Sequence, residues 1–278
     1  MKRCLPLLVL LALLLSWGAQ AQTRKGLMKQ VEASMLLTGR IDVSADGTVA
    51  GYSIDKAALV PPDVLAHVAR QVPHWSVAPA VSDGSPVASS SPFSLRLLAR
   101  RIDGDRYSIQ IVDTHIDEER AEHERLTVSA QVPPVYPTDV FSANGSGVVY
   151  LLLKIDRDGR VVDTHVERVD LTVLATRQIA QRFRKRLADS ARLAARDWTF
   201  HVPASGPQGD QVVRTPIAFV IGEEGREYGT WMVYLPGERT PAPWPFEDDG
   251  GNGAAVPGKP MLAGSGMRLV SGLEPEGG

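Results

Sequence analysis

Alternating apolar residues predict a β-hairpin near the middle of the chain, over residues 147–167. One face of its first strand carries four apolar side chains: Val149, Leu151, Leu153 and Ile155. A face that is apolar at every second position is typical of a half-buried strand. Asp158-Gly159 then favours a tight turn, because glycine adopts positive φ without steric cost and aspartate tolerates it. We expect the return strand to bury three side chains: Val162, Thr164 and Val166.

The same hairpin pattern occurs once earlier, over residues 40–54 around Asp46-Gly47. Both hairpins are followed by a helical pattern, a tryptophan segment, a glycine turn and two further strand patterns. Trp75 of the first copy corresponds to Trp198 of the second. A pattern that recurs in the same order indicates a repeated unit and therefore two similar domains.

The helix of each unit is predicted from its apolar stripe. In the first unit the helix begins at Pro61-Pro62-Asp63, buries Val64, Val68 and Val72, and stops at Pro73. In the second unit it spans residues 171–197, with a stripe formed by Ile179, Phe183, Leu187, Ala191 and Ala194. The tryptophan that follows each helix is expected to pack between helix and sheet.

These patterns predict an α+β protein with two tandem ββαββ units, each an antiparallel sheet packed on one helix. The first unit covers residues 27–114 and the second covers residues 133–236. A charged linker, 115–132, joins them. Residues 237–278 are rich in glycine and proline and poor in apolar residues, so we expect a disordered tail.

The N-terminus has the pattern of a signal peptide over residues 1–21. Lys2 and Arg3 precede an apolar stretch, and Ala19-Gln20-Ala21 gives the small-residue cleavage pattern. Cleavage after Ala21 predicts a periplasmic protein. The alternative is an inner-membrane anchor formed by residues 5–19, which is shorter than a usual bilayer span of about 20 residues. The single cysteine, Cys4, lies in this segment, so the exported chain would have no cysteine chemistry.

The rest of the composition offers little catalytic chemistry. The formal net charge of -2 gives no general attraction to nucleic acid. Four linker residues could be considered as metal ligands: His115, Asp117, Glu119 and His123. Their spacing is not that of a tight metal site, and a solvated linker is the favoured interpretation. Without a convergent set of titratable groups, we expect no enzyme activity, no cofactor and no metal.

The second unit resembles the C-terminal domain of TonB, the periplasmic arm of the machinery that energises outer-membrane receptors. The similarity covers about 90 residues, and its motifs occur in family order: Pro134-Val135-Tyr136-Pro137, Gly147, Asp156 to Val161, Trp198-Thr199-Phe200, Pro203-Ala204, Gly209 to Val212 and Pro216 to Phe219. The first unit is a fainter copy. The resemblance implies a non-enzymatic protein that recognises an outer-membrane receptor or another envelope protein by β-strand addition, in energy-coupled transport.

Two features differ from a full TonB. The N-terminal segment looks cleavable, and Ser16 is followed four positions later by Gln20 rather than histidine. Coupling to the inner-membrane motor complex is therefore not expected. The alternative function is that of a stand-alone envelope adaptor or structural module without energy coupling. The partner, any transported solute and the oligomeric state stay open.

The resemblance also implies where a partner would bind. In the family, the strand that matches residues 212–221 receives the partner peptide. We expect residues 228–234 to fold back and pair with this strand, covering its edge. The residues expected at this partner-binding edge are Val213, Thr215, Ile217, Phe219, Tyr228, Trp231 and Tyr234.

Overall fold

The computed structural model describes residues 26, 30–103, 106–118, 124–203, 210–222, 227–246, 254–264 and 266–273. The expected signal peptide, residues 1–21, lies outside the described residues. The described part is of the α+β class and consists mostly of strands in several antiparallel sheets. Its α-helices are α2 (Pro62–Gln71), α3 (Thr138–Phe141) and α4 (Arg177–Ala195).

The first sheet has the order β13-β1-β6-β7, with β2 paired to one half of β1. Its strands are β1 (Glu32–Val43), β2 (Val49–Ile54), β6 (Ser89–Asp103), β7 (Arg106–Ile116) and β13 (Met232–Tyr234). Because β2 pairs only with residues 39–43 of β1, the beginning of β1 needs another partner. The distant strand β13 supplies it by pairing with residues 32–34.

The second sheet has the order β10-β9-β12-β14. Its strands are β9 (Gly147–Ile155), β10 (Val161–Leu171), β12 (Gln211–Phe219) and β14 (Met261–Leu262). Three two-stranded pairs complete the described strands: β3 (Ser76–Val77) with β15 (Leu269–Ser271), β4 (Ala80–Ser82) with β5 (Ser85–Val87), and β8 (Thr127–Ala130) with β11 (Thr199–His201). The segment expected to be only a solvated linker therefore contributes β8 to one of these pairs.

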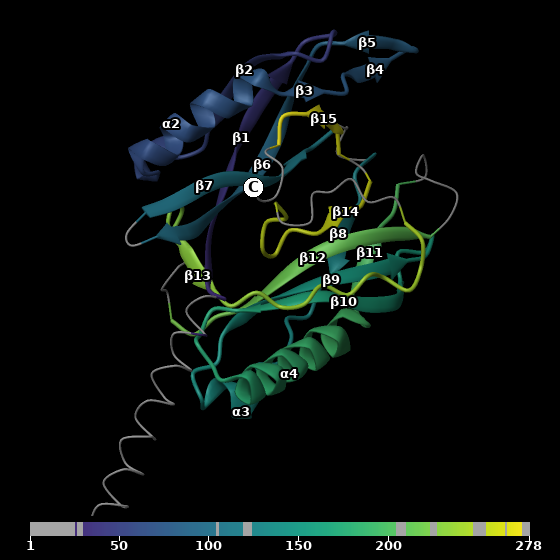
Figure 1. The fold of residues 1–278 in the computed structure, drawn as a ribbon. Helices are drawn as coiled ribbons and strands as arrows, with labels where there is room; N and C mark the ends of the chain where they lie inside the picture. The colour runs from purple at the N-terminus through teal and green to yellow at the C-terminus, as the bar shows by residue number, and fades with distance from the viewer. Residues whose placement is uncertain are drawn as a thin grey trace, which may run out of the picture.

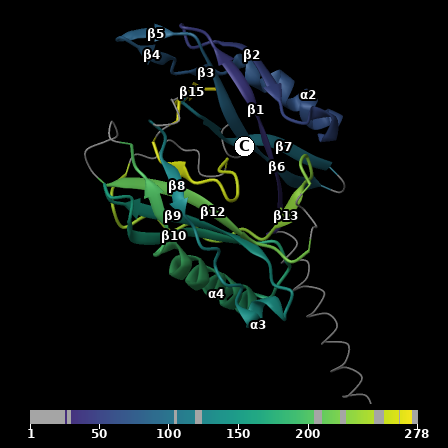
Figure 2. The same cartoon turned by 180° about the vertical axis from the view of Figure 1, so that it is seen from behind.

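The two sheets face each other, and their helices lie on the outside (Figure 1). Helix α2 covers the outer side of the first sheet, and α4 covers the outer side of the second, as the view from behind also shows (Figure 2). The C-terminal part of the chain, coloured yellow, runs between the sheets. It touches both, because β14 pairs with β12 while the carbonyl of Ala254 accepts a hydrogen bond from Ser94 of β6 (2.8 Å).

Both hairpin turns use glycine in the way the sequence predicts. Gly47 and Gly159 have φ angles of 86° and 77°. Each turn is also closed from outside by the tryptophan segment of its own half. The backbone N–H of Val77 donates to the carbonyl of Gly47 (2.9 Å), and that of Phe200 donates to the carbonyl of Gly159 (2.8 Å). A Cβ atom on Gly159 would lie 1.8 Å from the carbonyl oxygen of Phe200, so only glycine fits there.

Each helix packs against its own sheet through a separate hydrophobic core. The predicted stripe of α2 is confirmed, since Val64, Val68 and Val72 are fully buried. The predicted stripe of α4 is partly wrong, because Ala180 and Ala195 face the core while Ile179 is 40% exposed. The helix begins at Arg177, later than the predicted start, and at each end the buried residue lies one position after the predicted one.

The second hairpin contains two bulges that the alternating pattern does not reveal. The four predicted core residues of β9 are confirmed as fully buried: Val149, Leu151, Leu153 and Ile155. On β10 the register shifts between Val161 and Asp163 and again between Val166 and Arg168. Each bulge adds one residue and moves the following side chains to the other face. Val162, predicted to be buried, is the added residue of the first bulge and is 53% exposed.

Two predictions about the chain after β12 are wrong. Residues 228–234 do not fold back onto β12, because the three-residue strand β13 pairs with β1 of the first sheet instead. The tail is not disordered throughout, because β14 and β15 pair with β12 and β3. The second sheet thus takes its fourth strand from the tail, whereas the fourth strand of the first sheet, β7, follows β6 directly.

The predicted burial of both tryptophans is confirmed, with exposures of 2% for Trp75 and 1% for Trp198. Trp198 also donates a hydrogen bond from its indole N–H to the carbonyl of Val132 (2.8 Å). We expect Trp198→Ala to lower the free energy of unfolding by ~3–5 kcal/mol, since it leaves a large cavity in the second core. Urea denaturation of the purified protein measures this loss. Val81→Ala is the control, because Val81 is 65% exposed. Equal unfolding midpoints for the two variants would contradict the core role.

Candidate functional site

The edge of β12 is where the sequence places partner recognition, and it is occupied by the protein's own tail. β14 pairs antiparallel with β12, with Val213 opposite Leu262 and Arg214 opposite Met261. Two backbone hydrogen bonds extend this contact, from the N–H of Gly258 to the carbonyl of Pro216 (3.1 Å) and from that of Ala263 to the carbonyl of Val212 (2.8 Å). We refer to residues 254–264 as the tail segment.

The four predicted site residues on β12 are not a side-chain surface. Val213 and Thr215 are 0% exposed, and Phe219 and Ile217 are 3% and 9% exposed. Val213, Ile217 and Phe219 belong to the core beneath α4. What β12 offers at its edge is therefore backbone, and the side chains of these residues hold the strand in place. Ala218 is its one exposed residue.

The three predicted aromatic residues lie elsewhere, against the first sheet. The hydroxyl of Tyr228 accepts from the backbone N–H of Thr38 (2.9 Å) and lies 3.0 Å from the carbonyl of the same residue. Trp231 packs against the core of the first sheet. Tyr234 lies on β13 and donates its hydroxyl hydrogen to Glu32 on β1 (2.7 Å). These aromatic residues join the two halves of the molecule and do not meet the residues of β12.

The contact between the halves places polar groups in a low-dielectric environment. Burial raises the pKa of the Tyr234 hydroxyl above its usual range, and its hydrogen bond to Glu32 adds to this shift. Burial also raises the pKa of Asp170, although Arg168 lies 3.1 Å from its carboxylate and the N–H of Gly237 donates to it (2.9 Å). These groups position the chain just beyond β13.

A buried ion cluster fixes the start of the tail to the second sheet. Glu167 sits at a bulge of β10, and its carboxylate accepts from the Nε of Arg214 on β12 (3.2 Å) and from Arg239 of the tail (2.7 Å). The Arg214 side chain is 0% exposed, that of Glu167 is 5% exposed and that of Arg239 is 49% exposed. Thr240 adds a backbone N–H bond to the carbonyl of Glu167 (2.8 Å). Phe246 lies 5.8 Å from the Arg214 guanidinium, measured to the ring centre.

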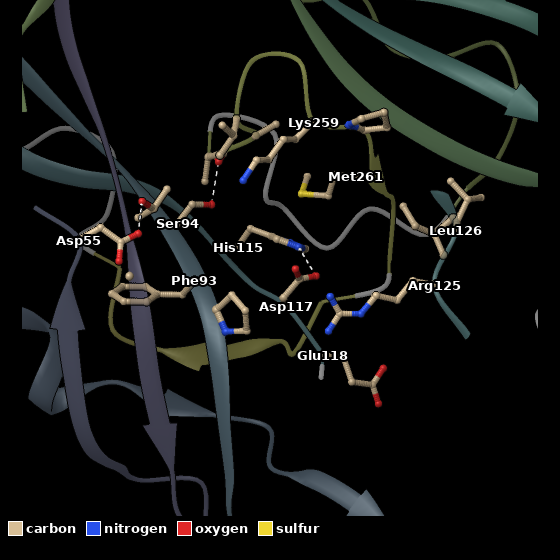
Figure 3. Close-up of a pocket in the computed structure, with 18 residues that line it drawn as sticks. Asp55, Phe93, Ser94, His115, Asp117, Glu118, Arg125, Leu126, Lys259 and Met261 are labelled. Atoms are coloured by element: carbon tan, nitrogen blue, oxygen red, sulfur yellow. Dashed lines mark hydrogen bonds and ion pairs between the residues drawn. The ribbon is translucent and has the colours of Figure 1, made fainter. Parts of the chain in front are cut away.

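A pocket of about 340 Å³ lies between the tail segment and the first sheet (Figure 3). One side of the pocket is lined by Phe93, Ser94 and His115 of the first sheet. The tail segment contributes Lys259 and Met261, and Leu126 lies just before β8. Its other charged lining residues are Asp55, Asp117, Glu118 and Arg125. The pocket therefore carries both signs of charge next to apolar side chains, a composition that can accommodate part of a peptide.

The four linker residues considered as metal ligands are not assembled into a site within the described part. His115 is buried on β7, and its Nε2 lies 3.5 Å from the Oδ1 of Asp117. Glu119 and His123 lie outside the described residues. Where side chains are described, no group of three or more potential ligands is placed to hold a metal ion. None of the described helices combines the length and apolar character needed to cross a bilayer.

No protein-family model, no curated protein and no solved structure matches this chain. The strand edge and the pocket therefore have to be interpreted from their own geometry.

Sequence patterns missed the tail segment and the Glu167 cluster. Met261 and Leu262 are an isolated apolar pair among glycines and prolines, which is too short to show strand periodicity. Glu167 lies on the face that the pattern assigns to solvent, and a bulge brings its carboxylate to Arg214. Trp244 near the start of the tail was a weak signal, and its ring makes an edge contact with His165 on β10 (6.0 Å between centres).

We expect Glu167→Ala to lower the free energy of unfolding by ~3–5 kcal/mol, because it removes the buried carboxylate that pairs with the fully buried Arg214 guanidinium. Urea denaturation at neutral pH measures the change. Arg239→Ala is the matched control, since it removes the half-exposed partner of the same carboxylate and should cost at most ~1 kcal/mol. A loss of equal size in the two variants would show that the Glu167–Arg214 pair is not the buried anchor.

Proposed function

We propose that this protein is an exported, non-catalytic recognition protein of the cell envelope, and that it binds an extended segment of an outer-membrane receptor or another envelope protein by strand addition. The observation that carries the proposal is the edge of β12, which holds a strand from a distant part of the chain. An edge that pairs with an extended segment through its backbone has the chemistry needed for a partner peptide.

The sequence resemblance to the TonB C-terminal domain supports the same strand as the receiving element. We further infer that the two halves are copies of one ββαββ unit. Their shared features support this inference, since in each half a tryptophan segment closes the hairpin through the carbonyl of the turn glycine, Gly47 or Gly159. In each half the first hairpin strand is also flanked by the second hairpin strand and by the long strand that follows the helix.

The proposal includes neither a cofactor nor nucleic acid as a ligand, and it places the mature chain in the periplasm after cleavage behind Ala21. A stand-alone adaptor without energy coupling is the second candidate. The tail segment favours this second candidate. Because the tail segment already pairs with backbone groups at the β12 edge, that edge does not depend on a receptor for its hydrogen bonds.

Photo-crosslinking in intact cells tests the proposed function. A photoreactive residue replaces Ala218, the exposed position of β12, and the matched control replaces Arg182 on the outer side of α4. We expect position 218 to form an adduct with an extended segment of an envelope protein, mapped by mass spectrometry, and position 182 not to form it. An adduct that persists after collapse of the proton gradient favours the adaptor.

Absence of an adduct at position 218, or identical adducts at both positions, would contradict recognition at this edge. The same cells provide the control for export, because the soluble periplasmic fraction should contain a chain that begins at Gln22. A chain that retains Met1 and sediments with the membranes would support the inner-membrane anchor instead.

A further inference from the structure

The tail segment forms only a short strand on a sheet whose other strands are long. β12 pairs with β9 over nine residue pairs, whereas it pairs with β14 over two. In the first sheet the equivalent place beside β6 is filled by the eleven-residue strand β7, which follows β6 directly in the chain order and pairs with it antiparallel. The same sheet position is thus held by a long local strand in one half and by a short distant strand in the other.

Few side chains anchor the tail segment. Its fully buried residues are Ala254 and Ala255, which contribute little apolar area. Leu262 is half-buried and packs against the second core. It lies directly opposite Val213 in the ladder of β12 and β14. Leu262 is therefore the main side-chain anchor on the β12 side.

The opposite side of the tail segment borders the 340 Å³ pocket and not a close-packed core (Figure 3). Atoms that face an unfilled space lose the dispersion contacts that a packed neighbour would supply. On this side the Ser94 hydroxyl donates to the carbonyl of Ala254, at the beginning of the segment, and attaches it to β6. Release of the segment would therefore disrupt little of either core.

We propose that residues 256–264 are an exchangeable strand, and that the β12 edge together with the adjoining pocket forms a groove for a partner's extended segment of the same chemistry. This inference rests on the proposed function and specifies the partner. The segment runs antiparallel to β12, presents an apolar residue at the place of Leu262, and is flanked by glycine or proline, as Pro257, Gly258 and Gly264 flank the tail strand.

Charge adds one more feature to the partner. When the tail strand leaves, Lys259 leaves the pocket with it. The charged residues that still line the pocket are then three carboxylates and one guanidinium: Asp55, Asp117, Glu118 and Arg125. A basic residue in the position of Lys259 is therefore electrostatically matched to the groove. The partner segment is apolar where it meets β12 and basic where it enters the pocket.

A reversible lock on the full mature chain tests this proposal. Val213 and Leu262 are directly opposite in the antiparallel ladder, where Cα separations suit a disulfide. The variant Val213→Cys/Leu262→Cys, made in a chain without Cys4, fixes the strand when oxidised and frees it when reduced. The probe is a fluorescent synthetic peptide with the sequence of residues 256–264, and anisotropy reports binding to the same variant in both states.

We expect saturable binding to the reduced form and binding about tenfold or more weaker to the oxidised form, because the lock removes the open population. A peptide with aspartate in place of Leu262 should fail to bind. Ala263→Pro in the chain removes the backbone donor to Val212 and weakens the internal strand, so this variant should bind the probe more tightly than the wild-type chain does. Circular dichroism verifies that each variant is folded.

Equal binding by the oxidised and reduced forms would overturn the proposal, and so would the absence of binding to both the reduced form and the Ala263→Pro variant. The outcome is separable from that of the proposed function. If oxidation of the double-cysteine variant weakens probe binding but no envelope adduct forms at position 218, the result supports strand exchange and contradicts envelope recognition. An envelope adduct of equal yield in locked and unlocked chains supports recognition and contradicts exchange.

Discussion

The open backbone edge of β12 is the constraint that organises the second half of the molecule. A sheet edge exposes unpaired N–H and C=O groups, and folded proteins cover such edges or pair them. In the first half the edge of β6 is covered locally, by the hairpin of β6 and β7, although the beginning of β1 takes β13 from a distant part of the chain. The second half does so with a segment from the end of the chain, which has to cross between the sheets to reach β12.

This solution ties the two halves together. β13 fills the vacant beginning of β1, and the Glu167 cluster then holds the chain that leaves β13 against the second sheet. Further along, residues after the tail segment contact the first half again, where the carbonyl of Arg268 accepts from the N–H of Ala78 (2.8 Å). Two strong attachments thus flank one weak strand, so that the weak strand can leave without detaching the rest of the tail.

The sequence predicts the local units well, because their signals are local. The alternation in β9, the two Asp-Gly turns and the valine stripe of α2 are each set by neighbouring residues, and the structure contains all of them. The bulges of β10 are not predicted, because one added residue in a strand has no distinctive residue type or pattern in the sequence. The pairing of β13 with β1 is not predicted for another reason. It depends on β2 being shorter than β1, which leaves the beginning of β1 without a partner on that side, and the sequence pattern does not show this difference in length.

The sequence directs the search for a site to one strand, but it does not predict how that strand is packed or what covers its edge. The resemblance directs attention to β12, yet Val213 and Thr215 turn out to be fully buried, and the edge is occupied by a different strand from the one expected. Met261 and Leu262 could not be recognised as that strand, because two residues carry no period. Their role depends on a partner strand, β12, that lies far away in the sequence.

Native-state hydrogen exchange of the full mature chain tests the central claim, that the tail segment is a weak strand on a stable sheet. The amides to follow are those of Gly258 and Ala263, which bond to β12, and that of Phe200, which bonds to Gly159 within the second half. We expect the two tail amides to exchange by a local opening, with a free energy well below that of global unfolding, while the Phe200 amide follows the more stable core. Exchange of all three amides with the free energy of global unfolding would contradict the account.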